Sequence, residues 1–103
     1  MASGTEEGII QPKFSLSQNY PNPFVPETTI EYSLAESCPV TLKIYNLSGQ
    51  LIKNLVDEYQ DAGHHKIIWH GVNDARQKVA SGVYFYRIKA GDFVSTKKMV
   101  VLK

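Results

Sequence analysis

The chain has 103 residues, of which 43% are hydrophobic and 20% are charged, and its formal net charge is +1. This length suits one domain, and the composition is typical of a globular protein rather than of a disordered chain. The small net charge argues against nucleic acid as a partner, because nucleic-acid-binding domains usually carry a strong basic excess on one face.

The single cysteine, Cys38, excludes an internal disulfide and a cysteine-rich metal site. The longest apolar run, Met99 to Leu102, is far shorter than the roughly twenty residues that span a bilayer. Met1 to Gly8 lacks the basic and apolar regions of a signal peptide, so a secreted protein would carry that signal on a longer precursor. We expect residues 1–12 to be a flexible linker or residues added for expression, and residues 13–103 to be the folded domain.

The domain is expected to begin with a short strand and a proline-rich connection. Phe14 to Leu16 forms the first apolar run, and Tyr20 to Pro26 follows as an extended or turning segment. Pro21 and Pro23 are its structural turn residues, since proline has no backbone N–H to donate to a sheet.

Three strands with alternating apolar and polar residues are predicted next, at residues 28–34, 40–45 and 50–58. Such alternation indicates sheets that are buried on one face and exposed to solvent on the other. The last two strands flank the turn Asn46 to Gly49, in which Gly49 is the structural glycine, so we expect them to form a hairpin.

A fifth strand, which contains Ile67 and Trp69, ends at Gly71 and is followed by a polar loop over residues 72–81. The two remaining strands, residues 82–89 and 93–103, are joined by a turn at Gly91. About seven short strands, with turn signals at intervals near ten residues, are typical of an immunoglobulin-like antiparallel β-sandwich. The predicted fold class is therefore all-β.

No group of residues in the sequence indicates catalysis or metal binding. His64 and His65 face opposite sides of any strand, and no carboxylate or cysteine is spaced to complete a tetrahedral ligand set with them or with His70. Ser48 and Ser81 precede glycines but lie in no nucleophile elbow and have no identifiable base. We therefore predict that the chain is not an enzyme and has no metal or other cofactor.

The aromatic residues allow two interpretations. Flat rings could line a carbohydrate-binding face, or they could fill the core of the sandwich. Trp69 shares the face of Ile67 on its strand, and Tyr84 and Tyr86 share that of Ile88. This alternation favours the core.

The last strand carries Lys97, Lys98 and Lys103 around an apolar run. Lysines on an edge strand discourage edge-to-edge aggregation, and that role alone would explain them. The same lysines could instead be charged contacts for a receptor. Their spacing does not decide between these two roles.

Several motifs occur in an order that points to a known family: Leu16 to Phe24, Pro26, Thr28 to Ile30, Val40 to Leu51, Ala62 to His64, Ala80 to Arg87, Ala90 to Phe93 and Lys98 to Lys103. Together they resemble the type A C-terminal sorting domains of the type IX secretion system, also called Por secretion system C-terminal domains. The immunoglobulin-like domain of flagellar hook-capping proteins is more distantly similar. Val25, His70 and Lys78 depart from the family pattern.

The resemblance implies a non-catalytic targeting module behind a cargo domain in the same precursor of a Bacteroidetes-like bacterium. Its partners would be the type IX outer-membrane translocon and a sortase-like peptidase that removes the module. The protein would pass through the periplasm to the cell surface or medium, and we expect it to be monomeric. The residues implied for translocon recognition are Gly82, Tyr84, Lys97, Lys98 and Lys103.

Two alternatives remain. The chain could be an accessory carbohydrate- or protein-binding immunoglobulin-like module of a secreted enzyme, or a structural spacer. The sorting hypothesis predicts a native gene that ends at Lys103 and encodes a signal peptide and a cargo domain upstream. The binding-module hypothesis predicts an exposed aromatic or polar groove, and the spacer hypothesis predicts neither.

Overall fold

The computed structural model describes residues 13–24 and 27–102, and the regular structure of these residues is entirely β-strand. The strands are β2 (Ser15–Leu16), β3 (Thr28–Leu34), β4 (Cys38–Asn46), β5 (Leu51–Gln60), β6 (Gly63–Trp69), β7 (Gly82–Ala90) and β8 (Phe93–Val101). The predicted linker at residues 1–12, together with Val25, Pro26 and Lys103, lies outside the described residues.

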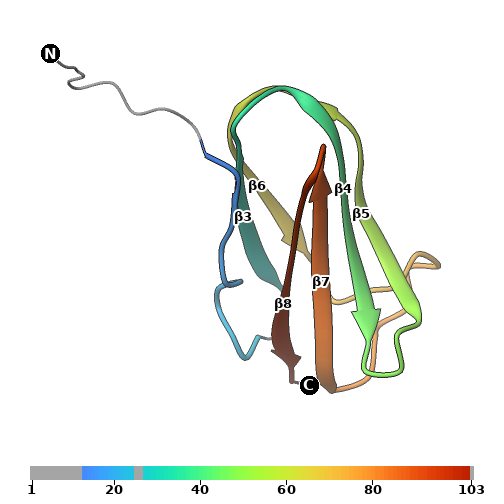
Figure 1. Ribbon diagram of the computed structural model, residues 1–103. Helices are drawn as coiled ribbons and strands as arrows, with labels where there is room; N and C mark the ends of the chain where they lie inside the picture. Colours follow the sequence, from blue (N-terminus) through green and yellow to red (C-terminus); the bar gives the residue numbers. More distant parts are fainter. Residues whose placement is uncertain (1–12, 25–26, 103) are drawn as a thin grey trace, which may run out of the picture.

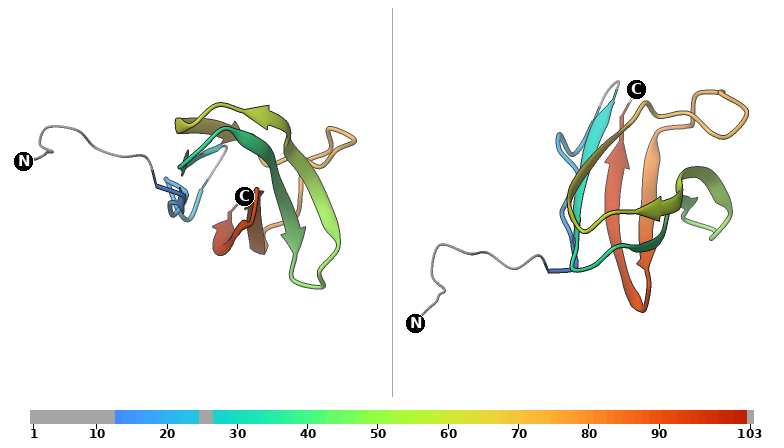
Figure 2. Two further views of the ribbon diagram at one scale, coloured as in Figure 1. Left: turned by 45° about the horizontal axis from the view of Figure 1, so that its top comes forward. Right: turned by 90° about the horizontal axis from the view of Figure 1, so that it is seen from above.

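Two sheets pack against each other. One has the strand order β2–β3–β6, and the other has the order β5–β4–β7–β8 (Figure 1). All pairings between these strands are antiparallel. Figure 2 shows how the chain crosses between the sheets after β3, after β5 and again after β6. The predicted antiparallel β-sandwich of seven strands is confirmed.

Alternate residues of strands from both sheets build the core, because successive side chains of a strand point to opposite faces. Ile30 and Leu34 of β3 are fully buried, and they share one apolar cluster with Leu42 of β4 and Ile88 of β7. Removal of this apolar surface from water is the main contribution that stabilises the fold.

The three aromatic residues predicted in the core lie there. Trp69 and Tyr84 are 1% and 7% exposed, and their rings meet edge to face with centroids 5.9 Å apart. Tyr86 is fully buried, and the indole N–H of Trp69 donates a hydrogen bond to the carbonyl oxygen of Val72 (2.8 Å). The predicted core position of these rings is confirmed, and their faces are unavailable to a sugar.

The hairpin between β4 and β5 is confirmed by their antiparallel pairing. Asn46 organises its turn, since its side-chain oxygen accepts hydrogen bonds from the backbone N–H groups of Ser48 (3.0 Å) and Gln50 (2.9 Å). Gly49 has a φ of +85°, a left-handed conformation that a residue with a Cβ adopts only with strain.

The other structural turn residues lie where the chain bends. Gly91 joins β7 to β8 with a φ of +58°, and its N–H donates to the carbonyl oxygen of Pro39 (3.2 Å). Pro21 and Pro23 lie between β2 and β3, and each follows a cis peptide bond. Both prolines are exposed, as expected for a connection outside the ladders.

The predicted polar loop over residues 72–81 also contributes to the core. Val79 is buried, and its N–H donates to the carbonyl oxygen of Gly71 (3.0 Å). The N–H of Asp74 donates to the carbonyl oxygen of Ile52 (3.1 Å), so the loop covers part of the outer edge of β5. Asn73 to Lys78, which precede Val79, are polar apart from Ala75, so no alternating apolar pattern indicates its burial.

Tyr86 links the segment before β3 to the central strand β7. Its hydroxyl accepts a hydrogen bond from the N–H of Asn19 (2.7 Å) and donates one to the carbonyl oxygen of Ser17 (2.7 Å). Asn19 is also buried, and its side-chain nitrogen donates to the hydroxyl oxygen of Thr28 (2.9 Å). Burial raises the pKa of Tyr86 to about 12, so the hydroxyl keeps its proton at neutral pH and can donate.

Replacement Tyr86→Phe is expected to lower the free energy of unfolding by about 1–3 kcal/mol, because it leaves the buried N–H of Asn19 without a partner. Urea denaturation followed by tryptophan fluorescence measures this difference. Tyr59→Phe is the matched control, since Tyr59 is exposed and should change stability by less than about 0.5 kcal/mol. Equal stability of the two variants would show that the Tyr86 hydroxyl does not hold this segment.

Candidate functional site

The terminal strand β8 lies at one edge of the four-stranded sheet, and one of its sides pairs with β7. The pairing runs from Gly82 opposite Val101 to Ala90 opposite Phe93, so the whole strand is held in an extended conformation. An unpaired strand edge exposes N–H and C=O groups to any other extended chain. What covers the other side of β8 is therefore central to its function.

Residues 18–24, which we call the covering segment, lie along the outer edge of β8. The side-chain nitrogen of Gln18 donates to the carbonyl oxygen of Lys98 (2.8 Å), and the N–H of Val100 donates to the side-chain oxygen of Asn22 (2.9 Å). Two amide side chains therefore satisfy backbone groups that would otherwise be available to another strand.

Phe24 completes this cover with its backbone. Its N–H donates to the carbonyl oxygen of Val100, and its carbonyl oxygen accepts from the N–H of Leu102, both at 3.1 Å. Its ring is 2% exposed and packs at a tilt of 59° against Trp69, with centroids 5.5 Å apart. The ring anchors the covering segment in the core while the backbone forms a short parallel bridge to β8.

The sequence-predicted lysines of the terminal strand lie on opposite faces. Lys97 is opposite Tyr86 on the core-side face and is half-buried, whereas Lys98 is opposite Phe85 on the outer face and is exposed. Lys103 is outside the described residues. The structure does not bring Lys97 and Lys98 together on one surface.

Gly82 and Tyr84 lie next to β8 through strand pairing. Gly82 begins β7 with a φ of +151°, opposite Val101, and Tyr84 is opposite Met99. The ring of Tyr84 faces the core, and its hydroxyl donates to the carbonyl oxygen of Ala80 (2.8 Å). Tyr84 can therefore influence the terminal strand through packing but does not present its ring on the surface.

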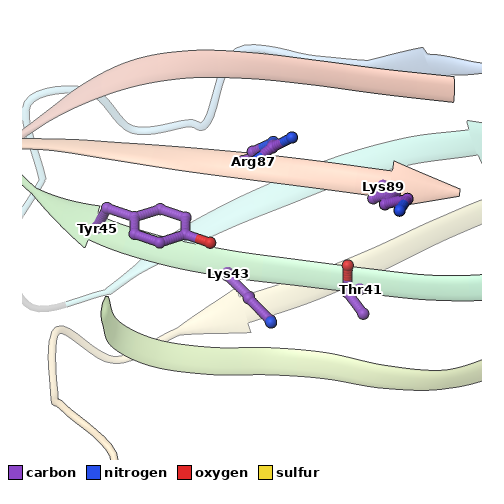
Figure 3. A pocket seen from close by; sticks show the side chains of 5 residues that line it. All are labelled: Thr41, Lys43, Tyr45, Arg87 and Lys89. Atoms are coloured by element: carbon purple, nitrogen blue, oxygen red, sulfur yellow. The ribbon is translucent and has the colours of Figure 1, made fainter. Parts of the chain in front are cut away.

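A shallow hollow lies on the outer face of the four-stranded sheet, over β4 and β7. Its volume is about 180 Å³, and Figure 3 shows the side chains that line it: Thr41, Lys43, Tyr45, Arg87 and Lys89. All five lie on outward-facing positions of their strands, but no sequence motif joins them. Their proximity depends on the register between β4 and β7.

The outer face of the three-stranded sheet carries an exposed hydrogen-bonded group. Tyr20 donates its hydroxyl hydrogen to the carboxylate of Glu31, which is also bonded to the ring of His64. The hydrogen bond from Tyr20, followed by that from His64, holds the pKa of Glu31 below its usual value. These contacts fasten the covering segment to β3 and β6.

The remaining candidates for chemistry are dispersed. Within residues 13–24 and 27–102, His, Cys, Asp and Glu form no group of three that could hold a metal ion. Cys38 is buried, and this burial raises the pKa of its thiol. His65 stacks on Tyr32 with centroids 5.3 Å apart, away from His64 on the outer face.

Within residues 13–24 and 27–102, no helix has the length and hydrophobicity that crossing a membrane requires.

Comparison with known proteins identifies the family. A family model described as the secretion system C-terminal sorting domain matches residues 18–102. The crystal structure of dimeric latent PorU from Porphyromonas gingivalis has a TM-score of 0.69 and 22% identity, with 97% of this chain and 10% of that chain aligned. PorZ, an essential bacterial surface component of the type IX secretion system of the same species, has a TM-score of 0.58 and 19% identity, with 87% of this chain and 11% of that chain aligned.

This chain spans about one tenth of each of those two structures, and their likeness shows a shared fold. No curated protein sequence matches the chain. The family model, in contrast, covers the described structure from the covering segment to the end of β8. The chain therefore belongs to the family of secretion system C-terminal sorting domains, which are sorting signals of the type IX secretion system.

Proposed function

We propose that this chain is a non-catalytic address, carried behind a larger cargo domain in one precursor and read by the type IX outer-membrane translocon. The cargo passes through the periplasm and reaches the cell surface or the medium, where a sortase-like peptidase removes the monomeric address. The observation that carries this proposal is the family match over residues 18–102.

The geometry of β8 suggests how the candidate recognition residues share this task. Lys98 is exposed on the outer face and can contact a receptor directly, and we assign the same role to Lys103. Lys97 is half-buried and can contribute only from the side of the strand that faces the other sheet. Gly82 and Tyr84 support recognition indirectly, because they fix the end of β7 against which β8 pairs.

The accessory-module hypothesis has less support. It predicts an exposed aromatic or polar groove. The rings of Trp69 and Tyr84 are buried and form no aromatic groove, so among the described residues only the polar hollow over β4 and β7 fits this hypothesis. A second hollow lies on the three-stranded sheet and is lined by Tyr20, Thr29, Lys66, Ile67 and Ile68. Tyr20 supplies the one aromatic ring in this lining. A lone exposed ring offers little of the stacking surface that sugar binding uses.

A fluorescent reporter behind a signal peptide and ahead of residues 13–103 tests the proposal in a host with type IX secretion. We expect the reporter at the cell surface or in the medium, measured by fractionation. Reporter that remains in the periplasm, with the fusion folded and intact, would contradict the proposed function.

In the same fusion, the triple replacement of Lys97, Lys98 and Lys103 by alanine is expected to reduce export while changing the free energy of unfolding by less than about 1 kcal/mol. Lys98 is exposed and Lys97 is only half-buried, and such charges usually contribute little to folding. Replacement of Lys13, Lys66 and Lys78 by alanine removes the same charge elsewhere and should leave export unchanged. Equal export by the two variants would assign the terminal lysines to protection of the sheet edge.

A further inference from the structure

The outer face of the four-stranded sheet gathers positive charge on its two central strands. Lys43 of β4 lies directly opposite Arg87 of β7, and Lys89 follows two positions later on β7. These three side chains line the hollow shown in Figure 3. The chain as a whole has a net charge of only +1, so this face is a local concentration of charge.

Protection of a sheet edge does not explain these cations. The strand order β5–β4–β7–β8 places β4 and β7 in the interior of the sheet, where neither has a free edge. Like charges directly opposite each other on neighbouring strands destabilise a sheet. The pair formed by Lys43 and Arg87 therefore opposes folding, which points to a role outside the fold.

None of these cations forms an ion pair within the part of the chain that the structure describes. The ion pairs there are Lys53 with Asp74, His64 with Glu31 and His70 with Glu27. The nearest carboxylate by strand register is Asp57, which lies opposite Thr41. Asp57 accepts a hydrogen bond from the side chain of Asn54 (3.5 Å) and forms no ion pair of 4 Å or less with a described lysine or arginine.

Two further features define what this face can bind. Lys98 of β8 adds a fourth cation on the same outer face, beside Phe85 and diagonal to Arg87. Tyr45 of β4 lies opposite Phe85 of β7. Its hydroxyl can donate a hydrogen bond to a ligand that the cations bind. The surface therefore offers charged and polar donors beside two aromatic rings.

We propose that this basic face, formed by Lys43, Arg87, Lys89 and Lys98 with Tyr45 at one end, docks an extended acidic segment of a protein of the export apparatus. The inference rests on the proposed sorting function and names the surface that the partner uses. Alternate residues of a strand, such as Arg87 and Lys89, are about 7 Å apart, and an extended partner repeats its side chains at the same interval. Carboxylates at alternate positions of that partner would match this spacing.

The shape and the number of charges favour such a segment over other anions. The hollow is shallow and holds only about 180 Å³, so a chain lying across it fits better than an enclosed small ligand. Four cations form a much shorter stripe than the phosphate backbone of a nucleic acid would use. An anionic membrane surface is the remaining competitor, and titration with anionic vesicles distinguishes it.

Export of the reporter fusion tests the basic face in cells. Lys43→Glu/Arg87→Glu is expected to reduce the exported fraction about tenfold relative to Lys13→Glu/Lys78→Glu, which changes the net charge equally at exposed sites elsewhere. Lys43→Gln/Arg87→Gln should impair export as well, with a melting temperature at or above that of the unchanged chain, because it removes the like-charge pair. Equal export by all three variants overturns the docking site, whereas failure of the unchanged fusion overturns the proposed function.

Binding in vitro tests the occupant independently of export. The isotopically labelled chain is titrated with a synthetic peptide of alternating glutamate and threonine, with its glutamine counterpart, and with phosphatidylglycerol vesicles. We expect NMR shift changes along β4 and β7 with the glutamate peptide alone, weakened about tenfold by Lys43→Glu/Arg87→Glu. Shift changes with vesicles alone, or with neither peptide, overturn the proposed occupant.

Discussion

Replacement Phe24→Ala is expected to lower the free energy of unfolding by about 3–5 kcal/mol, the usual cost of truncating a buried phenylalanine. The ring of Phe24 is almost fully buried against Trp69, and its loss leaves a cavity at the point where the covering segment enters the core. Urea denaturation followed by tryptophan fluorescence measures the loss. Leu47→Ala is the control, because Leu47 is 71% exposed in a turn and should change stability little.

The same replacement should also uncover the terminal strand. Alanine retains the backbone groups that bond to Val100 and Leu102, but without the ring nothing anchors them in the core. The exposed edge of β8 should then associate with other chains, which light scattering detects as larger species. Phe24→Leu keeps an apolar anchor and should scatter clearly less. Equal scattering by the two variants would mean that the side chain of Phe24 does not protect the edge.

Alternation along the sequence was sufficient to predict most of the sandwich. The alternation over residues 28–34 predicts Ile30 and Leu34 on one face of a strand, and both are fully buried in β3. The turn residues Asn46 to Gly49 were sufficient to predict the hairpin of β4 and β5. These features are local, because strand periodicity and turn chemistry each depend on a few consecutive residues.

The covering segment could not be predicted in the same way. Its prolines predicted only an extended or turning segment over residues 20–26. The bonds from Gln18 to Lys98 and from Val100 to Asn22 join residues far apart in the sequence, through side chains that have no periodic pattern. Only the folded arrangement of both sheets brings these groups within hydrogen-bonding distance.

The candidate site shows a similar division. The separation of Lys97 from Lys98 follows from the alternation of a strand, the same rule that separates His64 from His65. The basic face required more information. Lys43 and Arg87 are neighbours only because of the register between β4 and β7, and a shift of one residue would move one of them to the core.

The strongest effect on export is expected when the terminal strand is separated from its domain. A reporter that carries only residues 93–103 should remain in the periplasm, while the fusion with residues 13–103 is exported. In the domain, β8 is held extended by β7 on one side and by the covering segment on the other. A free peptide must order its own backbone at a cost of about 1–2 kcal/mol per residue, so it rarely adopts that shape.

A full-length control separates the role of the fold from that of the terminal sequence. Ile88→Asp places an unpaired carboxylate in the core, which should unfold the domain while leaving residues 93–103 unchanged. If the address is a folded surface, both this variant and the short peptide are retained, as fractionation of the reporter would show. Efficient export of the short peptide would mean that the terminal sequence is itself the signal. The sandwich would then protect the strand edge until the translocon binds it.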